Sequence, residues 1–187
     1  MYSVTLFYIK TMSCKTILYI AMSEDGFIAG ENDNIDFLNP YQVENEDYGY
    51  KEFINSVGHI LVGRRTYEKV IGMGYHYHTD KIVYVATRNL RQSENENLIY
   101  YNGSLKALIT KLKASQNTNI YCDGGAELAQ SLIAENLIDQ ITLSIIPIKL
   151  ENGTLLFDKG MVPHNFSLKK KREFKTRLVQ FSYELKK

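Results

Sequence analysis

The chain has 187 residues, of which 44% are hydrophobic, enough to bury the core of a single domain. Its 22 Lys and Arg residues nearly balance its 21 Asp and Glu residues, so the net charge of +1 offers no electrostatic basis for binding nucleic acid or an acidic membrane surface. Cys14 and Cys122 are far apart and have no C-x-x-C spacing, which argues against a disulfide scaffold and a structural zinc site. We therefore expect a cytoplasmic protein whose partner is a small molecule.

The N-terminal residues differ from the rest of the chain. The apolar segment 2–9 is too short to span a membrane, no basic region precedes it, and no small-residue cleavage site follows it, so a signal peptide is not expected. Met12 stands just before the first strong strand. We expect residues 1–14 to be an N-terminal extension without a folded role and residues 15–187 to form a single domain.

Short apolar runs of β-forming residues alternate with amphipathic segments along most of the chain. The predicted strands are residues 15–22, 59–62, 81–86, 98–101, 119–122 and 141–148, and a shorter extended segment covers residues 27–30. Helices are predicted at residues 48–57, after Gly63, after an N-cap at Ser104, and at residues 128–137. Residues 166–174 and 178–185 are predicted to form a hairpin. This order indicates an α/β fold with a mainly parallel central sheet, helices on both faces and an antiparallel C-terminal hairpin.

Three of the predicted strands end in residues suited to binding a ligand. These residues are Gly63-Arg64-Arg65-Thr66, Thr87-Arg88-Asn89 and Asp123-Gly124-Gly125. The C-terminal ends of parallel strands share one edge of a sheet, and ligands bind in the crevice outside that edge. Adjacent glycines allow a positive φ and a close approach to a ligand, while the N–H groups at the start of the next helix attract a phosphate. The arginines could donate to a ribose 2′-phosphate, which favours NADPH over NADH.

At these positions the sequence resembles the dihydrofolate reductase-like fold, and within it the reductase domain that forms the C-terminal half of the bifunctional riboflavin-biosynthesis deaminase-reductase. The matching segments are residues 23–29, 62–68, 87–88, 123–128 and 151–157. Their order and spacing match from about residue 15 to residue 185. The resemblance implies an NADPH-dependent reductase in which the protein orients the hydride that the cofactor supplies.

The resemblance also implies the roles of individual residues. The nicotinamide end of NADPH would contact Ala21 and Ile28. The phosphates, the adenosine 2′-phosphate and the pyrophosphate would be bound by three further sets of residues: Gly63, Arg64, Arg65 and Thr66; Thr87 and Arg88; and Asp123, Gly124, Gly125, Ala126, Glu127 and Leu128. The substrate would be bound by Asp25, Asp36, Phe37 and Thr154.

One departure from the family bears on the substrate. The folate reducers carry an acid on the helix after the loop, and the comparable position here falls near Gly49. Asp47 could take the catalytic role from the preceding turn, although an Asp at this place is more often a helix cap. We therefore expect a riboflavin-type reductase acting on a pyrimidine or pterin-like molecule. The alternatives are a dihydrofolate reductase that uses Asp47 and a non-catalytic NADPH-binding domain. The zinc motifs of the riboflavin-pathway deaminase, H-x-E and P-C-x-x-C, are absent from the sequence, so the reductase would stand alone.

Two further patterns are interpreted as structural. His76 and His78 have the spacing of a metal pair on a strand, but no third ligand is visible nearby, so we expect a solvated aromatic loop and no metal site. The basic run 169–172 lies in a strand whose Phe166, Leu168 and Phe174 are expected to face inward, which predicts a solvated sheet edge. Related domains commonly pair, so a homodimer is possible.

Overall fold

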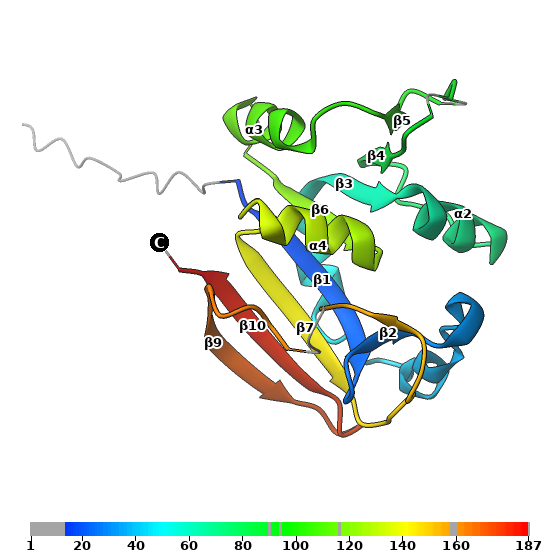
Figure 1. Cartoon of the computed structure of the whole chain (residues 1–187). Helices are drawn as coiled ribbons and strands as arrows, with labels where there is room; N and C mark the ends of the chain where they lie inside the picture. The colour runs from blue at the N-terminus through cyan, green and yellow to red at the C-terminus, as the bar shows by residue number, and fades with distance from the viewer. Residues whose placement is uncertain (1–13, 90, 94, 116, 158–160, 187) are drawn as a thin grey trace, which may run out of the picture.

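A computed structural model describes residues 14–89, 91–93, 95–115, 117–157 and 161–186. Its strands are β1 (Thr16–Ser23), β2 (Phe27–Ala29), β3 (Val57–Gly63), β4 (Ile82–Ala86), β5 (Leu98–Tyr101), β6 (Asn119–Gly124), β7 (Gln140–Ile146), β8 (Thr154–Leu155), β9 (Phe166–Glu173) and β10 (Val179–Leu185). Its helices are α1 (Tyr50–Asn55), α2 (Arg64–Gly72), α3 (Leu105–Ser115) and α4 (Ala126–Ala134), with 3₁₀ turns η1 (Glu31–Asp33) and η2 (Asp36–Tyr41). Figure 1 shows these elements along the chain.

Eight of the described strands form one sheet in the order β5-β4-β3-β6-β1-β7-β10-β9. The pairs from β5 to β7 are all parallel, while β10 runs antiparallel to β7 and β9 antiparallel to β10. β2 and β8 form a separate antiparallel pair. This arrangement confirms the predicted fold class, including the C-terminal hairpin.

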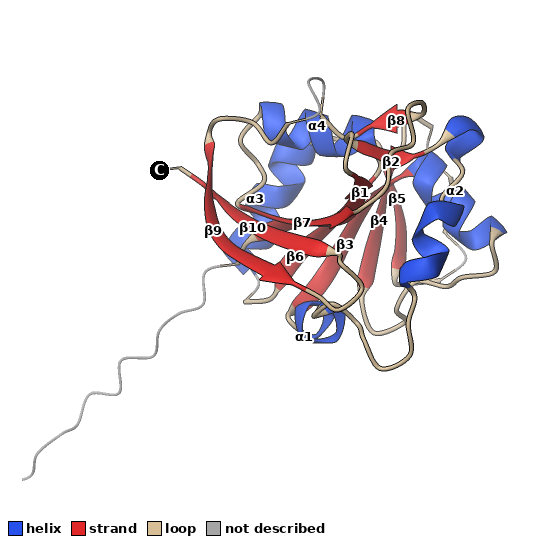
Figure 2. Cartoon of the chain, turned by 90° about the horizontal axis from the view of Figure 1, so that it is seen from below, coloured by secondary structure: helices blue, strands red, loops and turns tan. Residues whose placement is uncertain are grey.

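The sheet buries apolar residues on both faces, as the near-continuous apolar runs of its central strands require. One cluster packs α3 and α4 against the sheet and includes Leu18, Ile120 and Leu132, all at most 1% exposed. A second cluster gathers Ile54 of α1 with residues of β3 and β4. Figure 2 shows α4 and α1 on opposite faces of the sheet. The molecule therefore has helices on both faces, as expected.

The predicted elements agree with the structure in type, and several of their bounds differ. The N-cap at Ser104 is confirmed, because the backbone N–H of Ala107 donates to its Oγ at 3.2 Å. α1 has only six residues, because it begins at Tyr50, directly after Gly49, whose φ of +89° is not helical. β7 ends at Ile146, just before Pro147. Residues 1–13 of the predicted extension lie outside the described residues, whereas Cys14 is buried. Within the described part of the chain, no helix is long and apolar enough to cross a bilayer.

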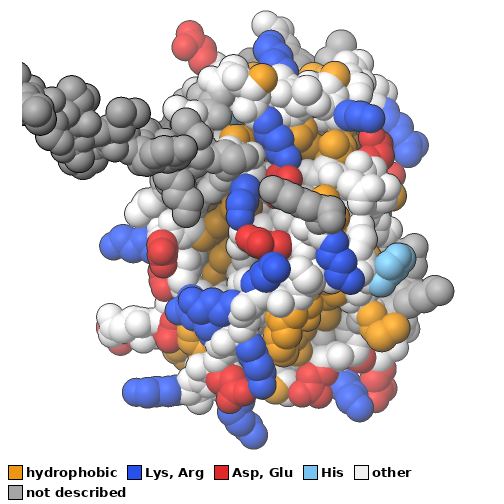
Figure 3. Space-filling model, turned by 90° about the vertical axis from the view of Figure 1, so that its left-hand side faces the viewer, with side chains coloured by type: hydrophobic (Ala, Val, Ile, Leu, Met, Phe, Trp, Pro, Cys, Tyr) orange, Lys and Arg blue, Asp and Glu red, His pale blue; other side chains and the backbone are white. Residues whose placement is uncertain are grey.

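The inward orientation predicted for Leu168 is wrong, because its side chain is 53% exposed. β9 is the outermost strand of the sheet, and its pairing with β10 shifts register between Tyr183–Leu168 and Ser182–Lys170. Such a bulge interrupts the alternation of side chains between the two faces. Figure 3 shows basic, acidic and hydrophobic side chains interspersed on this side of the molecule. Lys171 forms an ion pair with Glu173 at 2.6 Å, and both side chains are exposed, as expected for a solvated sheet edge.

Candidate functional site

The three strand ends singled out in the sequence meet at one edge of the sheet. β4, β3 and β6 are neighbours and run parallel. Gly63 is in register with Ala86, and Val62 with Gly124. The residues that follow β3, β4 and β6 therefore lie side by side, which confirms their predicted placement.

The turns after β3 and β6 touch through glycines. A Cβ atom on Gly63 would lie 3.5 Å from the carbonyl oxygen of Gly124, and one on Gly125 would lie only 2.8 Å from Oγ1 of Thr66. The N–H of Gly125 donates to the same Oγ1 at 2.8 Å. Gly124 has φ +96°, the conformation for which glycine is suited, and the peptide bond to Gly125 is cis. A side chain at Gly125 would therefore have to displace the Thr66 hydroxyl, whereas a Cβ on Gly63 would make an ordinary contact with the turn after β6.

Both turns lead directly into a helix of nine residues. α2 begins at Arg64 and α4 at Ala126, and neither start has a side chain capping it in the described structure. The first N–H groups of a helix have no partner within the helix and carry part of its positive dipole. Two such helix starts at one edge of the sheet form a surface suited to a phosphate-bearing ligand.

Each candidate arginine at this edge is already paired with an acid. Arg65 contacts Asp33 at 2.8 Å, and Arg64 contacts Glu68 at 3.6 Å. Arg88 lies 3.4 Å from Glu127, with side chains that are 94% and 89% exposed. Exposed pairs of this kind contribute little to stability, so a phosphate could displace the acids from the arginines.

A further arginine at this edge was not singled out in the sequence. Arg91, three residues after Arg88, contacts Glu68 at 3.0 Å, so Glu68 lies between Arg91 and Arg64. Its position in the loop that follows the third predicted strand was the signal that could have identified it.

Thr87, a predicted cofactor residue, forms a local turn in which its Oγ1 donates to the carbonyl oxygen of Asn89 at 3.1 Å.

Of the other predicted cofactor residues, Ala21 and those of α4 lie near the glycine turn. Ala21 of β1 and Ile28 of β2 are half-buried. Cδ1 of Ile20 is 3.5 Å from the position of a Cβ on Gly124, which places Ala21 just past this turn. In the first turn of α4, Ala126 and Glu127 present backbone N–H groups, whereas the side chain of Leu128 is buried in the core.

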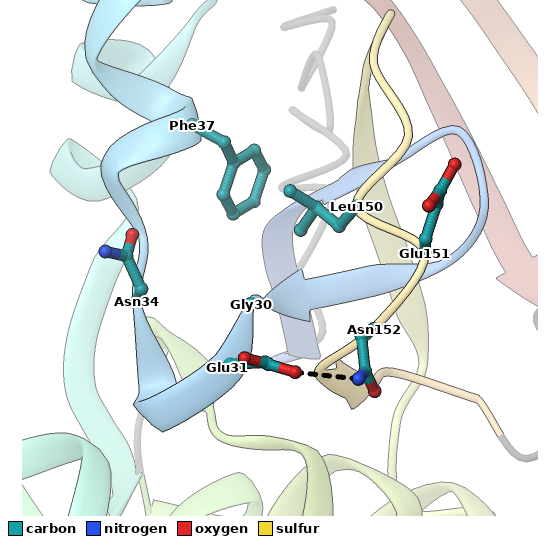
Figure 4. Close-up of a pocket in the computed structure, with 7 residues that line it drawn as sticks. All are labelled: Gly30, Glu31, Asn34, Phe37, Leu150, Glu151 and Asn152. Carbon is teal, nitrogen blue, oxygen red and sulfur yellow. Dashed lines mark hydrogen bonds between the residues drawn. The ribbon is translucent and has the colours of Figure 1, made fainter.

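Two adjoining cavities lie beside β2 and β8. One of about 480 Å³ is lined by Gly30, Glu31, Asn34, Phe37, Leu150, Glu151 and Asn152. In Figure 4, Phe37 and Leu150 face one another across it, and Nδ2 of Asn152 donates to Oε1 of Glu31 at 2.8 Å. The second, of about 400 Å³, shares three of these residues and adds Asn32, Asp33, Arg65, Gly153 and Thr154. Phe37 and Thr154 therefore line neighbouring cavities, and Arg65 joins them to the start of α2.

Asp25 and Asp36 hold turns in place. Asp25 accepts hydrogen bonds from Oγ of Ser23 at 2.5 Å and from the backbone N–H groups of Leu150 and Glu151. Burial opposes its ionisation, but these hydrogen bonds outweigh burial and lower the pKa of its carboxyl group. Asp36 closes a turn with Asn34, whose Nδ2 donates to it at 2.9 Å. Both carboxylates shape the loops around the cavities.

Asp47 has the geometry of a helix cap. Its Oδ1 accepts from the N–H of Gly49 at 2.9 Å, and its Oδ2 from the N–H of Lys51 at 2.8 Å. These two bonds lower the pKa of the exposed carboxyl group. An exposed acid that is ionised at neutral pH is a poor proton donor, so the geometry favours the cap over the catalytic role.

An aromatic cluster covers the face of β6 that points toward α1. The Tyr19 and Phe53 rings stack at 4.5 Å, and Tyr121 packs edge-on against Phe53 at 4.9 Å. Within this cluster, Oδ1 of Asp123 accepts from the Tyr121 hydroxyl at 2.5 Å and Oδ2 from the Tyr77 hydroxyl at 2.7 Å. Any contact of Asp123 with a pyrophosphate would therefore come from its backbone.

The segment with two histidines is only partly the solvated loop that was expected. His76 and His78 are exposed, but Tyr77 between them is half-buried against Asp123. The hydroxyl of Tyr50 lies 3.3 Å from Nε2 of His78. The described residues contain no group of three side chains that could hold a metal ion. Sequence spacing could not identify Tyr77, because its partner Asp123 is 46 residues away.

The sequence matches the model of the RibD C-terminal domain over residues 15–180. The chain belongs to the RibD C-terminal domain family. Two Bacillus subtilis proteins of uncharacterized function are similar to it. YwjB is 36% identical over 174 residues, covering 92% of this chain and 98% of YwjB. YyaP is 29% identical over 181 residues, covering 90% of this chain and 94% of YyaP.

Two solved structures resemble this RibD C-terminal domain. A protein from Shewanella sp. PV-4, whose suggested role is in riboflavin biosynthesis, superposes with a TM-score of 0.81 at 26% identity and covers 92% of this chain and 99% of its own. A dihydrofolate reductase from Enterococcus faecalis, in complex with NADP(H) and RAB-propyl, has a TM-score of 0.67 at 16% identity and covers 94% and 99%. The second likeness shows the fold alone. Family and fold together indicate a reductase of the riboflavin type.

Proposed function

We propose that this RibD C-terminal domain is an NADPH-dependent reductase of a small pyrimidine or pterin-like molecule, similar to 5-amino-6-(5-phosphoribosylamino)uracil reductase of riboflavin biosynthesis. The contact between the two glycine turns carries the proposal. Side chains at Gly63 and Gly125 would fill the space between the starts of α2 and α4, and glycine keeps both backbones accessible. Such a surface suits the pyrophosphate of a dinucleotide.

The arginines support NADPH over NADH. Arg64, Arg88 and Arg91 lie on the helix and loop that follow neighbouring strands, and among the described residues each pairs with an exposed acid. A ribose 2′-phosphate would offer them stronger, charge-assisted hydrogen bonds. When bound, NADPH would supply the hydride, and the residues of this chain would hold the dinucleotide and exclude water from the reacting ring.

The geometry around α1 supports a riboflavin-type substrate over dihydrofolate. Two acids lie there: Asp47 is exposed and caps the helix, and Glu52, in the first turn of α1, is exposed as well. Beside β2, the cavities lined by Phe37 and Thr154 combine an aromatic ring with amide and carboxylate groups, which suits a polar heterocycle.

Titration of the purified protein with NADPH and NADH, followed by cofactor fluorescence, tests the cofactor. We expect NADPH to bind at least tenfold more tightly, because a 2′-phosphate gains charge-assisted hydrogen bonds. Arg88→Ala should weaken NADPH more than NADH. Lys170→Ala, which removes a charge at the opposite end of the sheet, should affect neither. Equal affinity for the two cofactors in the wild-type protein would contradict the proposal.

Turnover tests the reaction. We expect NADPH oxidation with an aminopyrimidine riboside phosphate and none with dihydrofolate. NADPH binding without oxidation across a panel of pterins and aminopyrimidine ribosides would instead identify a non-catalytic binding domain.

A homodimer and a cytoplasmic location remain predictions. Light scattering of the purified protein checks the oligomeric state.

A further inference from the structure

A carboxylate with two phenol donors lies directly before the Gly124 turn. The hydroxyls of Tyr121 and Tyr77 each donate to one oxygen of Asp123. An ionised carboxylate can accept about four hydrogen bonds, so each oxygen retains capacity for another donor. Asp123 is half-buried, and no described Lys, Arg or His forms an ion pair with it. Partial burial without a cationic partner leaves room for a donor from a ligand.

Both phenols are held as donors. Burial raises the pKa of Tyr77 and the pKa of Tyr121 well above that of a free tyrosine, and the negative charge of Asp123 raises both further. Neither hydroxyl therefore gives up its proton at neutral pH, and Asp123 acts only as an acceptor toward them. The two hydrogen bonds fix the orientation of the Asp123 side chain.

Tyr77 connects this carboxylate to the cofactor edge. Its ring stacks on Tyr67 of α2 with centroids 5.6 Å apart, and α2 begins at the glycine turn. On the other side, the Tyr121 hydroxyl lies 3.2 Å from the carbonyl oxygen of Tyr19, two residues before Ala21. Asp123 thus lies between the start of α2 and the part of β1 where the nicotinamide is expected.

On the basis of the proposed reductase function, we propose that Tyr77 is a positioning residue that fixes Asp123 as the acceptor for adjacent N–H donors of the substrate. A carboxylate that accepts from two parallel N–H groups recognises an amidinium-like edge, such as that of an aminopyrimidine protonated at the ring nitrogen beside the amino group. Asp123 then takes the substrate-anchoring place that α1 leaves without a buried acid. Pyrimidines that present acceptors at the same edge are rejected, because they would face an unpaired charge.

Paired ligands test this selectivity on the full chain saturated with NADPH. The probes are 2,4-diaminopyrimidine, which presents adjacent N–H donors when a ring nitrogen is protonated, and 2,4-dimethoxypyrimidine, which has the same ring without amino donors, both titrated by calorimetry. We expect the wild type to prefer the diamino compound at least tenfold, since a hydrogen bond to a charged group contributes that much or more. Asp123→Asn should abolish the preference, and Tyr77→Phe should reduce it several-fold.

Controls separate positioning from damage to the fold. Tyr75→Phe, two residues earlier and 55% exposed, should retain the full preference. General loosening by Tyr77→Phe would lower the affinity for both pyrimidines equally, which would overturn the positioning role. An unchanged preference in Asp123→Asn, or no binding of 2,4-diaminopyrimidine by the wild type, would overturn the assigned ligand class. NADPH affinity is measured first, and its absence would count against the proposed function instead.

Discussion

Gly125→Ala tests the contact between the two glycine turns. The Gly125 backbone has φ −65°, which any residue adopts, so the effect of the substitution should come from the new Cβ. That atom would lie 2.8 Å from Oγ1 of Thr66, closer than carbon and oxygen atoms pack. Forcing an extra methyl group into a packed site typically costs about 1–3 kcal/mol. We expect the free energy of unfolding to fall by about this amount.

A double-mutant cycle isolates this contact. Thr66→Ala removes the hydroxyl that both accepts from the N–H of Gly125 and blocks the new methyl group. Alone it should cost about 1 kcal/mol for the lost hydrogen bond. In the Thr66→Ala background, Gly125→Ala should cost at least about 1 kcal/mol less than in the wild type. Urea unfolding with an unchanged m-value measures each corner of the cycle. An equal cost of Gly125→Ala in both backgrounds would refute the contact.

Three further predictions concern other parts of the molecule. His59 is buried, and its Nδ1 has no hydrogen-bond partner among the described residues. Burial lowers the pKa of the folded-state imidazole. Below about pH 6.5, the unfolded chain therefore binds a proton at His59 more readily than the folded chain does, and the free energy of unfolding falls. Urea unfolding at pH 7 and pH 5 should therefore show a smaller loss for His59→Gln than for the wild type, and identical losses would contradict this. Gln180 is 3% exposed, and its Nε2 donates to the Tyr19 hydroxyl, to Oγ of Ser144 and to a backbone carbonyl. Gln180→Leu should therefore lower the free energy of unfolding by about 1–3 kcal/mol in the same assay. An unchanged free energy of unfolding would show that these bonds make no net contribution to stability. Asp47→Ala should lower the thermal unfolding temperature by removing the cap of α1 while NADPH-dependent turnover is retained, and loss of turnover in a folded variant would restore Asp47 as the catalytic acid.

Local patterns in the sequence determined the class of the fold and the place where the polar strand ends meet. Apolar runs such as that of β1 have the composition of strands buried on both faces, and they do not depend on distant residues for this property. The proximity of the three polar strand ends could be predicted from the sequence, because parallel strands have their C-terminal ends at one edge of the sheet. The positive φ of Gly124 could also be anticipated from the glycine pair alone, because glycine has no Cβ and adopts this conformation readily.

Tertiary structure decided which polar groups meet. Asp123 was assigned to a pyrophosphate from its neighbours in sequence, but its side chain contacts Tyr77, 46 residues away. Asp25 was expected at the substrate and holds the turn at Leu150, 125 residues away. Leu168 follows the apolar alternation of a buried strand, yet the place of β9 at the edge of the sheet leaves it exposed. The partner of a polar side chain depends on strand order and register, and local composition does not encode these pairings because many chain paths satisfy the same pattern.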